Sequence, residues 1–184
     1  MAIWEDHILL WRSKRGDRGA FDLIYQKHLD TLLTVAMSLL GNAGDAEDVV
    51  QEVFTSFVES LDTIRLHGSL RGFLAVCVAN KARDLLRRRS RTGPEPDSTT
   101  PAADSAEPLE LVIRNEQVRC LQDALSRLPY EQREVILLHV HAGLTFRAMA
   151  DALKVPRGTV QSRYRYGLNS LKAALNREDT HETR

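Results

Sequence analysis

The stretch that decides the fold is "LTFRAMADALKVPRGTVQSRYRYGLNSLKAAL", residues 144–175. It predicts a short helix capped by Thr145, a tight turn "KVP", and a longer amphipathic helix. The small Ala150 stands where two helices joined by so short a turn must approach closely. This pattern is typical of a helix-turn-helix. The predicted inner face of the second helix consists of Val160, Tyr164, Leu168, Leu171 and Leu175.

The second helix concentrates positive charge, because residues 155–175 hold four basic side chains and no acidic one. A recognition helix enters the major groove of DNA by its N-terminal residues, where Arg and Gln can pair with base edges. Tyr166 can also reach the groove, whereas Arg163, Lys172 and Arg177 suit the phosphate backbone. The residues predicted to contact duplex DNA are Arg157, Thr159, Gln161, Ser162, Arg163, Arg165 and Tyr166.

The whole chain is neutral, with 25 Lys+Arg against 25 Asp+Glu in 184 residues. It has no apolar run of the roughly 18 residues that a membrane span needs, and its N-terminus lacks a signal-peptide layout. Cys77 and Cys120 lie in apolar helical patterns, which favours buried free thiols in a reducing cytoplasm. His139 and His141 are two residues apart, on different helix faces, which disfavours a metal site.

A break in composition divides the chain. "RTGPEPDSTTPAADSAEPLE", residues 91–110, holds four prolines and, after Arg91, only acidic charges, so it cannot build a packed core. We predict an all-α fold of two small helical domains joined by a flexible acidic linker. The predicted boundaries are 1–91 for the first domain, 92–108 for the linker, 109–178 for the second domain and 179–184 for a tail.

The first domain contains two amphipathic helices. The first begins at an Asp17 cap, ends at Gly41, and places His28 on its apolar stripe. The second, around "DAEDVVQEVF", has only acidic charges on its polar face, and no basic residue occurs between 42 and 62. Unpartnered acids repel one another, whereas a solvated face usually mixes signs. A solvated face and a docking surface for a basic partner therefore remain the two interpretations.

A third helix, "FLAVCVANKARDLLRRRSR", begins apolar and turns basic. Phosphate binding explains this density of charge better than solvation does. The loop "TIRLHGSL" precedes this helix. The charged residues of the basic half are Lys81, Arg83, Arg87, Arg88, Arg89 and Arg91, against the single acid Asp84.

Four blocks in order carry a resemblance: "GDRGAF", "DAEDVVQEVF", "LRGFLAVCVANKARDLLRRR" and "LPYEQREVILLHVHAGLTFRAMADALKVPRGTVQSRY". Together they resemble a bacterial RNA polymerase sigma factor of the extracytoplasmic-function type, over nearly the whole chain. The resemblance implies a region 2 domain, a region 4 domain with the helix-turn-helix, and a cytoplasmic protein that is not an enzyme and needs no cofactor.

The resemblance also implies partners. The acidic helix would dock on the clamp coiled coil of the polymerase beta-prime subunit through Asp45, Asp48, Gln51 and Glu52. The helix-turn-helix would read the −35 element and pack on the beta flap, and the linker would thread the polymerase channel. Family members are commonly held by an anti-sigma factor. At the −10 element, the loop "TIRLHGSL" would form a pocket for a base flipped out of the stack. The residues implied on the adjoining helix are Asn80, Lys81, Arg83, Asp84, Arg87 and Arg88.

The chain departs from the family pattern at four positions. Phe73 and Val76 stand where Trp and Arg are frequent, and Gln161 stands where Lys or Arg is common. Lys154 replaces a frequent turn glycine, which would cost about 1 kcal/mol if that position requires a positive φ.

Two other functions fit the sequence less well. A stand-alone helix-turn-helix regulator leaves the acidic and the first basic helix without a role. A nucleic-acid enzyme lacks support, because the sequence shows no nucleotide-binding glycine loop, metal-ligand cluster or nucleophile–His arrangement.

Overall fold

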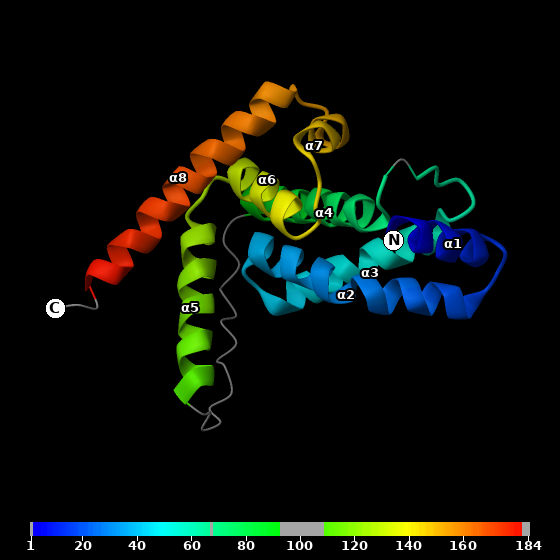
Figure 1. The fold of residues 1–184 in the computed structure, drawn as a ribbon, viewed down its shortest axis with the longest axis horizontal. Helices are drawn as coiled ribbons and strands as arrows, with labels where there is room; N and C mark the ends of the chain where they lie inside the picture. The colour runs from blue at the N-terminus through cyan, green and yellow to red at the C-terminus, as the bar shows by residue number, and fades with distance from the viewer. Residues whose placement is uncertain (1, 67, 93–108, 182–184) are drawn as a thin grey trace.

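The computed structural model describes residues 2–66, 68–92 and 109–181, which form eight α-helices and confirm the predicted all-α class (Figure 1). Most of the predicted linker lies outside the described residues, while Arg91 and Thr92 complete a helix. The helices are α1 (Ala2–Lys14), α2 (Arg18–Leu40), α3 (Ala43–Glu59), α4 (Leu70–Thr92), α5 (Leu109–Ser126), α6 (Tyr130–Val140), α7 (Phe146–Leu153) and α8 (Arg157–His181).

Side-chain caps fix where three of these helices begin. Asp17 accepts the Ala20 N–H at 3.1 Å, Asn42 the Asp45 N–H at 3.0 Å, and Thr145 the Ala148 N–H at 3.2 Å. Each cap satisfies a backbone donor that has no partner within the helix. Gly41 ends α2 with φ 71°, so both predicted signals of α2 are confirmed.

Helix α1 was not predicted, and it is fastened to α2 by a buried polar cluster. Asp6 is 4% exposed and accepts Lys27 Nζ at 2.9 Å. His28 Nε2 lies 3.4 Å from the same carboxylate, and burial lowers the His28 pKa. The prediction of a core histidine is thus confirmed. Trp4, Ile8 and Trp11, in contrast, face solvent from α1.

Helices α6, α7 and α8 build the helix-turn-helix around an aromatic cluster. The Tyr164 ring lies 5.2 Å from that of Phe146 and 5.0 Å from that of His139, and Val160 is fully buried. The predicted inner face is wrong at Leu168, which is 37% exposed. Gly167 takes its place, because α8 crosses α6 so closely that a Cβ there would lie 2.7 Å from Ile136 Cδ1.

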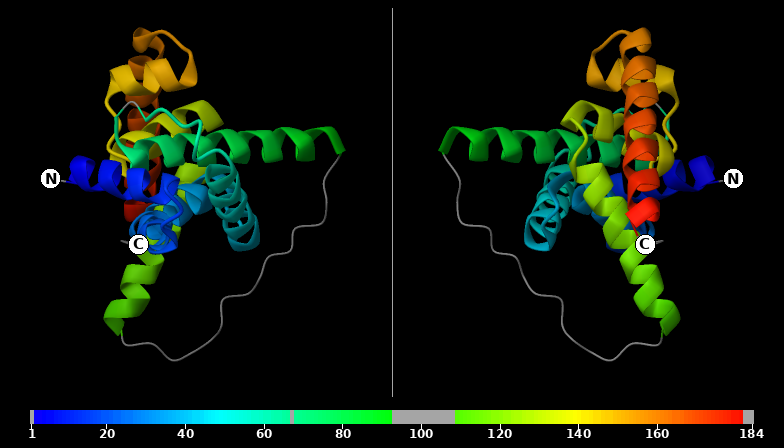
Figure 2. Two further views of the ribbon diagram at one scale, coloured as in Figure 1. Left: turned by 90° about the vertical axis from the view of Figure 1, so that its right-hand side faces the viewer. Right: turned by 90° about the vertical axis from the view of Figure 1, so that its left-hand side faces the viewer.

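Helix α6 joins the two halves of the molecule. Its residues 134–138 are all buried, and five successive residues turn through more than one full turn of helix. This central segment of the helix is therefore covered on every side, by α8 on one and by α2 and α4 on the other. Figure 2 shows α7 and the start of α8 at one extremity, away from α2 and α3, and the C-terminal end of α4 extending beyond its neighbours.

Candidate nucleic-acid and polymerase interface

The early turns of α8 present a stripe of polar side chains to solvent. Arg157, Gln161 and Arg165 recur every four residues, so they share one helix face, and all three are exposed. Tyr166 is 54% exposed, with the Arg165 guanidinium 5.1 Å from its ring centre. These four predicted residues are brought together in a form that can meet a DNA groove.

The other three predicted residues of this helix are half-buried. Ser162 Oγ donates to the Thr159 carbonyl at 2.9 Å, so this hydroxyl already has a partner within the helix. The Arg163 side chain is likewise only partly exposed. These three residues are therefore less accessible than sequence spacing suggested, because α8 packs against α6 and α7 along its inner side.

The turn before α8 is strained at one position. Lys154 adopts φ 55°, the left-handed region that L side chains rarely occupy. Its N–H, like that of Val155, bonds to the Ala150 carbonyl, which closes α7. The condition stated from the sequence is therefore met, and the cost of about 1 kcal/mol applies at this position.

A cavity of about 250 Å³ opens between α3 and α4. The phenyl rings of Phe57 and Phe73, 6.5 Å apart, both lie on its lining, together with Cys77, whose pKa is raised by burial. The polar lining of the cavity includes the hydroxyl residues Ser56 and Ser60 at the end of α3. From α4 it includes Asn80, Lys81 and Asp84, three of the six residues predicted at the −10 element.

The remaining predicted −10 residues do not share this cavity. Arg87 and Arg88 are exposed further along α4. Arg83 instead pairs with Glu134 of α6 and is half-buried, with a weak bond of 3.4 Å to Asn80 Oδ1. Sequence spacing could not show that Arg83, unlike the other basic residues of α4, forms an ion pair with α6. Its partner, Glu134, lies 51 positions further along the chain.

The acidic face of α3 differs from the prediction. The acids were expected to lack partners, but Asp45 pairs with Arg89 at 2.7 Å and Glu52 with Lys81 at 2.9 Å. Both cations come from α4, so the absence of basic residues between 42 and 62 was misleading. Asp48 and Gln51 are exposed, and Asp48 has no ion-pair partner within the described residues.

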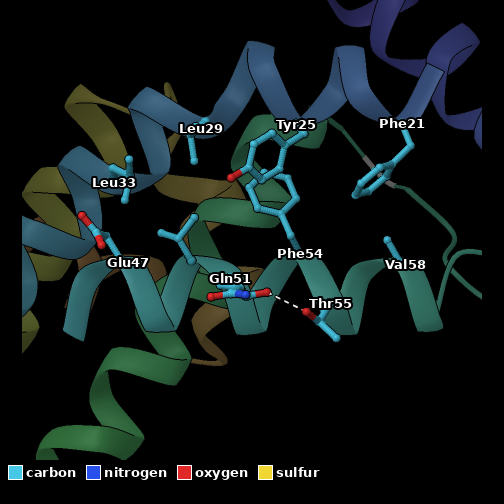
Figure 3. A pocket seen from close by; sticks show the side chains of 10 residues that line it. Phe21, Tyr25, Leu29, Leu33, Glu47, Gln51, Phe54, Thr55 and Val58 are labelled. Carbon is cyan, nitrogen blue, oxygen red and sulfur yellow. Dashed lines mark hydrogen bonds between the residues drawn. The ribbon is translucent and has the colours of Figure 1, made fainter. Parts of the chain in front are cut away.

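An apolar groove of about 630 Å³ between α2 and α3 escaped the sequence analysis (Figure 3). Tyr25 lies against Phe54 with ring centres 4.6 Å apart, and Val58 is 44% exposed at one end. Gln51 and Glu47 stand on its α3 side. The helical period places these apolar residues on a core-facing stripe, but it does not show that α2 and α3 leave part of that stripe open.

Neither cysteine forms a disulfide, and both are half-buried rather than buried. Within the part of the chain that the structure describes, no group of His, Cys, Asp and Glu is arranged to hold a metal ion. None of the helices described there has the length and apolar character to cross a membrane.

Two family models match the chain: Sigma-70 region 2 over residues 24–92 and Sigma-70 region 4 over residues 118–171. The ECF RNA polymerase sigma factor SigM of Mycobacterium tuberculosis is 31% identical, over 86% of this chain and 78% of its own. The chain belongs to the extracytoplasmic-function (ECF) sigma factors. Like them, this sigma factor directs RNA polymerase to promoters, and a regulator acting without polymerase is not favoured.

Solved structures agree with this assignment. The structure of CnrH in complex with the cytosolic domain of CnrY has a TM-score of 0.70 and 26% identity, covering 94% of this chain and 97% of CnrH. The RpoE of Bartonella quintana, solved with the anti-sigma factor NepR, has a TM-score of 0.67 and 24% identity, covering 85% and 96%. The second likeness shows the fold of the sigma factor alone.

Proposed function

We propose that the exposed stripe on α8 reads the −35 element of the promoter. Arg157, Gln161 and Arg165 carry this proposal, because they are exposed on one face at the start of the second helix of a helix-turn-helix. Arg and Gln are also the side chains that pair with guanine and adenine edges. Lys172, exposed further along, contacts phosphate and contributes affinity without sequence preference.

The cavity beside α4 is the −10 site in this proposal. Opening a duplex requires a base to leave the stack and enter a protein pocket. Two phenyl rings supply apolar and stacking surface, while Asn80 supplies an amide that can pair with a base edge. Lys81 and the exposed Arg87 hold the phosphates on either side. The boundaries 1–91 and 109–178 remain our proposal for the two domains.

Core polymerase binds the outer side of α3 in this scheme. Asp48 and Gln51 are exposed, and Gln51 borders the apolar groove, so charge and apolar contact area adjoin. A basic surface with protruding apolar side chains complements such a site. Asp45 and Glu52 are already paired with α4, and we assign them the smaller share of the binding energy.

Membership of the family supports two further proposals, which do not concern particular residues. The chain supplies promoter specificity in the cytoplasm and leaves catalysis to the polymerase, so it is not itself an enzyme. An anti-sigma factor is a further partner, by analogy with the Bartonella protein, which was solved with one.

The polymerase contact is tested by titrating core enzyme with the variant Asp48→Lys. We expect affinity to fall about tenfold, equivalent to 1.4 kcal/mol, because a cation replaces an exposed anion facing a basic partner. Glu59→Lys, an exposed acid at the end of the same helix, is the matched control. Adding Glu52→Lys would also set a second cation against Lys81. Equal affinities for wild type and Asp48→Lys would show that the acidic face of α3 is a solvated surface and does not bind polymerase.

A further inference from the structure

Gly158, the second residue of α8, is exposed and lies in open space. Apart from its chain neighbours and the adjoining helix backbone, no heavy atom of the described residues comes within 4 Å of the position that a Cβ would occupy. Other glycines are required by the fold. Gly72 and Gly167 lie where a Cβ would come within 2.6 and 2.7 Å of a neighbour. Left-handed φ angles occur at Gly16, Gly41, Gly68 and Gly143, so Gly158 has neither reason.

The matching position in two other helices shows the difference. Gly19 and Gly44 are second in α2 and α3, and there the oxygen of the capping side chain lies 3.4 Å from the position of a Cβ. Pro156 precedes α8 and has no polar side chain that could cap it. Alanine at Gly158 would restrict the unfolded chain without straining the folded one, so glycine lowers the stability of the free protein. What glycine provides here is space, which only a bound partner can use.

Gly158 lies on the side of α8 that faces away from the core. Val160, which is fully buried, is two positions on and about 200° round the helix, so it points to the opposite side. Arg165 is seven positions on, which returns to nearly the same side as Gly158. The start of α8 also lies at one extremity of the molecule, away from α2 and α3 (Figure 2). This side of the helix is therefore open to a partner as large as a DNA duplex.

The surface around Gly158 is low in the centre and high at its edges. Ser162, one turn on, directs its hydroxyl back to the Thr159 carbonyl at 2.9 Å, so it adds little height. The longer side chains that surround these residues are those of Arg157, Gln161, Arg165 and Tyr166. The major groove admits an α-helix whose side chains reach the base edges. The absence of a side chain at Gly158 lets the backbone of α8 come closer to the bases than a larger residue would.

We propose that Gly158 is a specificity-determining residue, because its Cα lies against the −35 duplex where any side chain would hold α8 away. The proposal rests on the proposed function, in which Arg157 and Gln161 pair with base edges. A Cβ would project about 1.5 Å from the Cα, the length of a carbon–carbon bond. A hydrogen bond of about 2.9 Å is lost when it is lengthened beyond about 3.5 Å. One methyl group at Gly158 is therefore enough to weaken the base contacts made by the same face.

The first measurement is the thermal unfolding of the free full-length chain. Gly158→Ala should raise the melting temperature by about 1–4 °C, because alanine reduces the conformational freedom of the unfolded chain. Gly19→Ala, exposed at the matching position of α2, should give a rise of similar size. A fall in the melting temperature of Gly158→Ala would show that the fold itself requires glycine, and it would overturn the proposal.

The second measurement is the binding of holoenzyme to double-stranded promoter DNA. One DNA carries the −35 sequence that the wild type enriches most from a randomised library, and the other carries that element scrambled. The ratio of the two affinities should fall about tenfold in Gly158→Ala and about a hundredfold in Gly158→Leu, because a bidentate base contact discriminates by roughly 5- to 150-fold. Gly19→Ala and Gly19→Leu should keep the wild-type ratio.

Gln161→Ala, measured in the same way, separates this proposal from the proposed function. If Gln161→Ala lowers the ratio and Gly158→Leu keeps the wild-type value, Gly158 does not set the approach of α8, and the reading of the −35 element stands. If both variants keep the wild-type ratio, the proposed function of α8 fails as well. A ratio that falls with the size of the residue at position 158, with no loss of thermal stability, confirms the close approach.

Discussion

Helices α4 and α8 are both long and basic, yet their cations are in different states. On α8 the early side chains Arg157, Gln161 and Arg165 face solvent. On α4, Lys81, Arg83 and Arg89 each pair with a carboxylate from another helix. The number of positive charges on a helix therefore does not give the charge that it offers to DNA, because tertiary neighbours neutralise some of it.

The comparison also shows where part of the acid that balances the basic charge is used. Two acids of α3 and one of α6 compensate cations of α4, while residues 155–175 of α8 contain no acid at all. The basic side chains at the start of α8 are therefore available to bind duplex DNA. On α4 the cavity is open to solvent, but part of the positive charge is already paired with carboxylates of the protein.

The comparison treats both α4 and α8 as helices that contact DNA. It would be wrong for α4 if the residues that line its cavity did not discriminate between bases. Replacing Asn80 with Ala removes the amide from the cavity lining and should lower base discrimination at one −10 position by about 1–3 kcal/mol, or roughly 5- to 150-fold. The measurement is transcription by holoenzyme from a library randomised in the −10 element. Asn169→Ala, an exposed amide later on α8, is the control. Identical −10 preferences in Asn80→Ala and wild type would show that the cavity is not a base site.

A smaller effect distinguishes the turns that precede the two helices. The loop before α4 has its positive φ at Gly68, whereas the turn before α8 has it at Lys154. Lys154→Gly should raise the free energy of unfolding by about 1 kcal/mol, because glycine relieves the left-handed strain. Thermal unfolding should shift upward by about 2–4 °C. Lys154→Ala retains the strain and should give no such gain, so equal shifts in the two variants would rule out strain as the cause.

The smallest effect concerns the free end of α4. Arg87 is exposed and should contact one phosphate of the opened strand. Arg87→Ala should flatten the log–log salt dependence of promoter binding by holoenzyme by about 0.7, which is about 0.3 kcal/mol for a doubling of salt. Arg18→Ala, an exposed cation at the start of α2, should leave the slope unchanged. Equal slopes for all three proteins would make Arg87 a solubilising residue.

Local signals in the sequence predicted much of this architecture. Asp17 and Thr145 bind backbone donors within their own helices, so the caps could be located from a few neighbouring residues. The positive φ of Lys154 was raised as a condition, because Lys154 stands where the family frequently has a turn glycine. The order of four motif blocks predicted the family, because each block is a contiguous run.

Features that depend on distant neighbours were not predictable. The partners of Asp45 and Arg83 lie 44 and 51 positions away, and no periodic pattern encodes them. Gly167 replaces Leu168 on the inner face of α8 because the crossing with α6 leaves no room for a side chain. Helix α1 was missed because its inward face includes the polar Asp6 and Ser13, while Trp4 and Trp11 point outward.

The central claim is that α8 reads base sequence through its exposed early stripe. The most direct measurement is transcription from a library randomised in the −35 element, by holoenzymes carrying wild type, Gln161→Ala or Lys172→Ala. Our account predicts that Gln161→Ala relaxes the preference at one −35 position, while Lys172→Ala weakens all sequences alike. If both variants keep the wild-type preferences at every position, Gln161 does not read the promoter, and the contrast between α8 and α4 loses its basis.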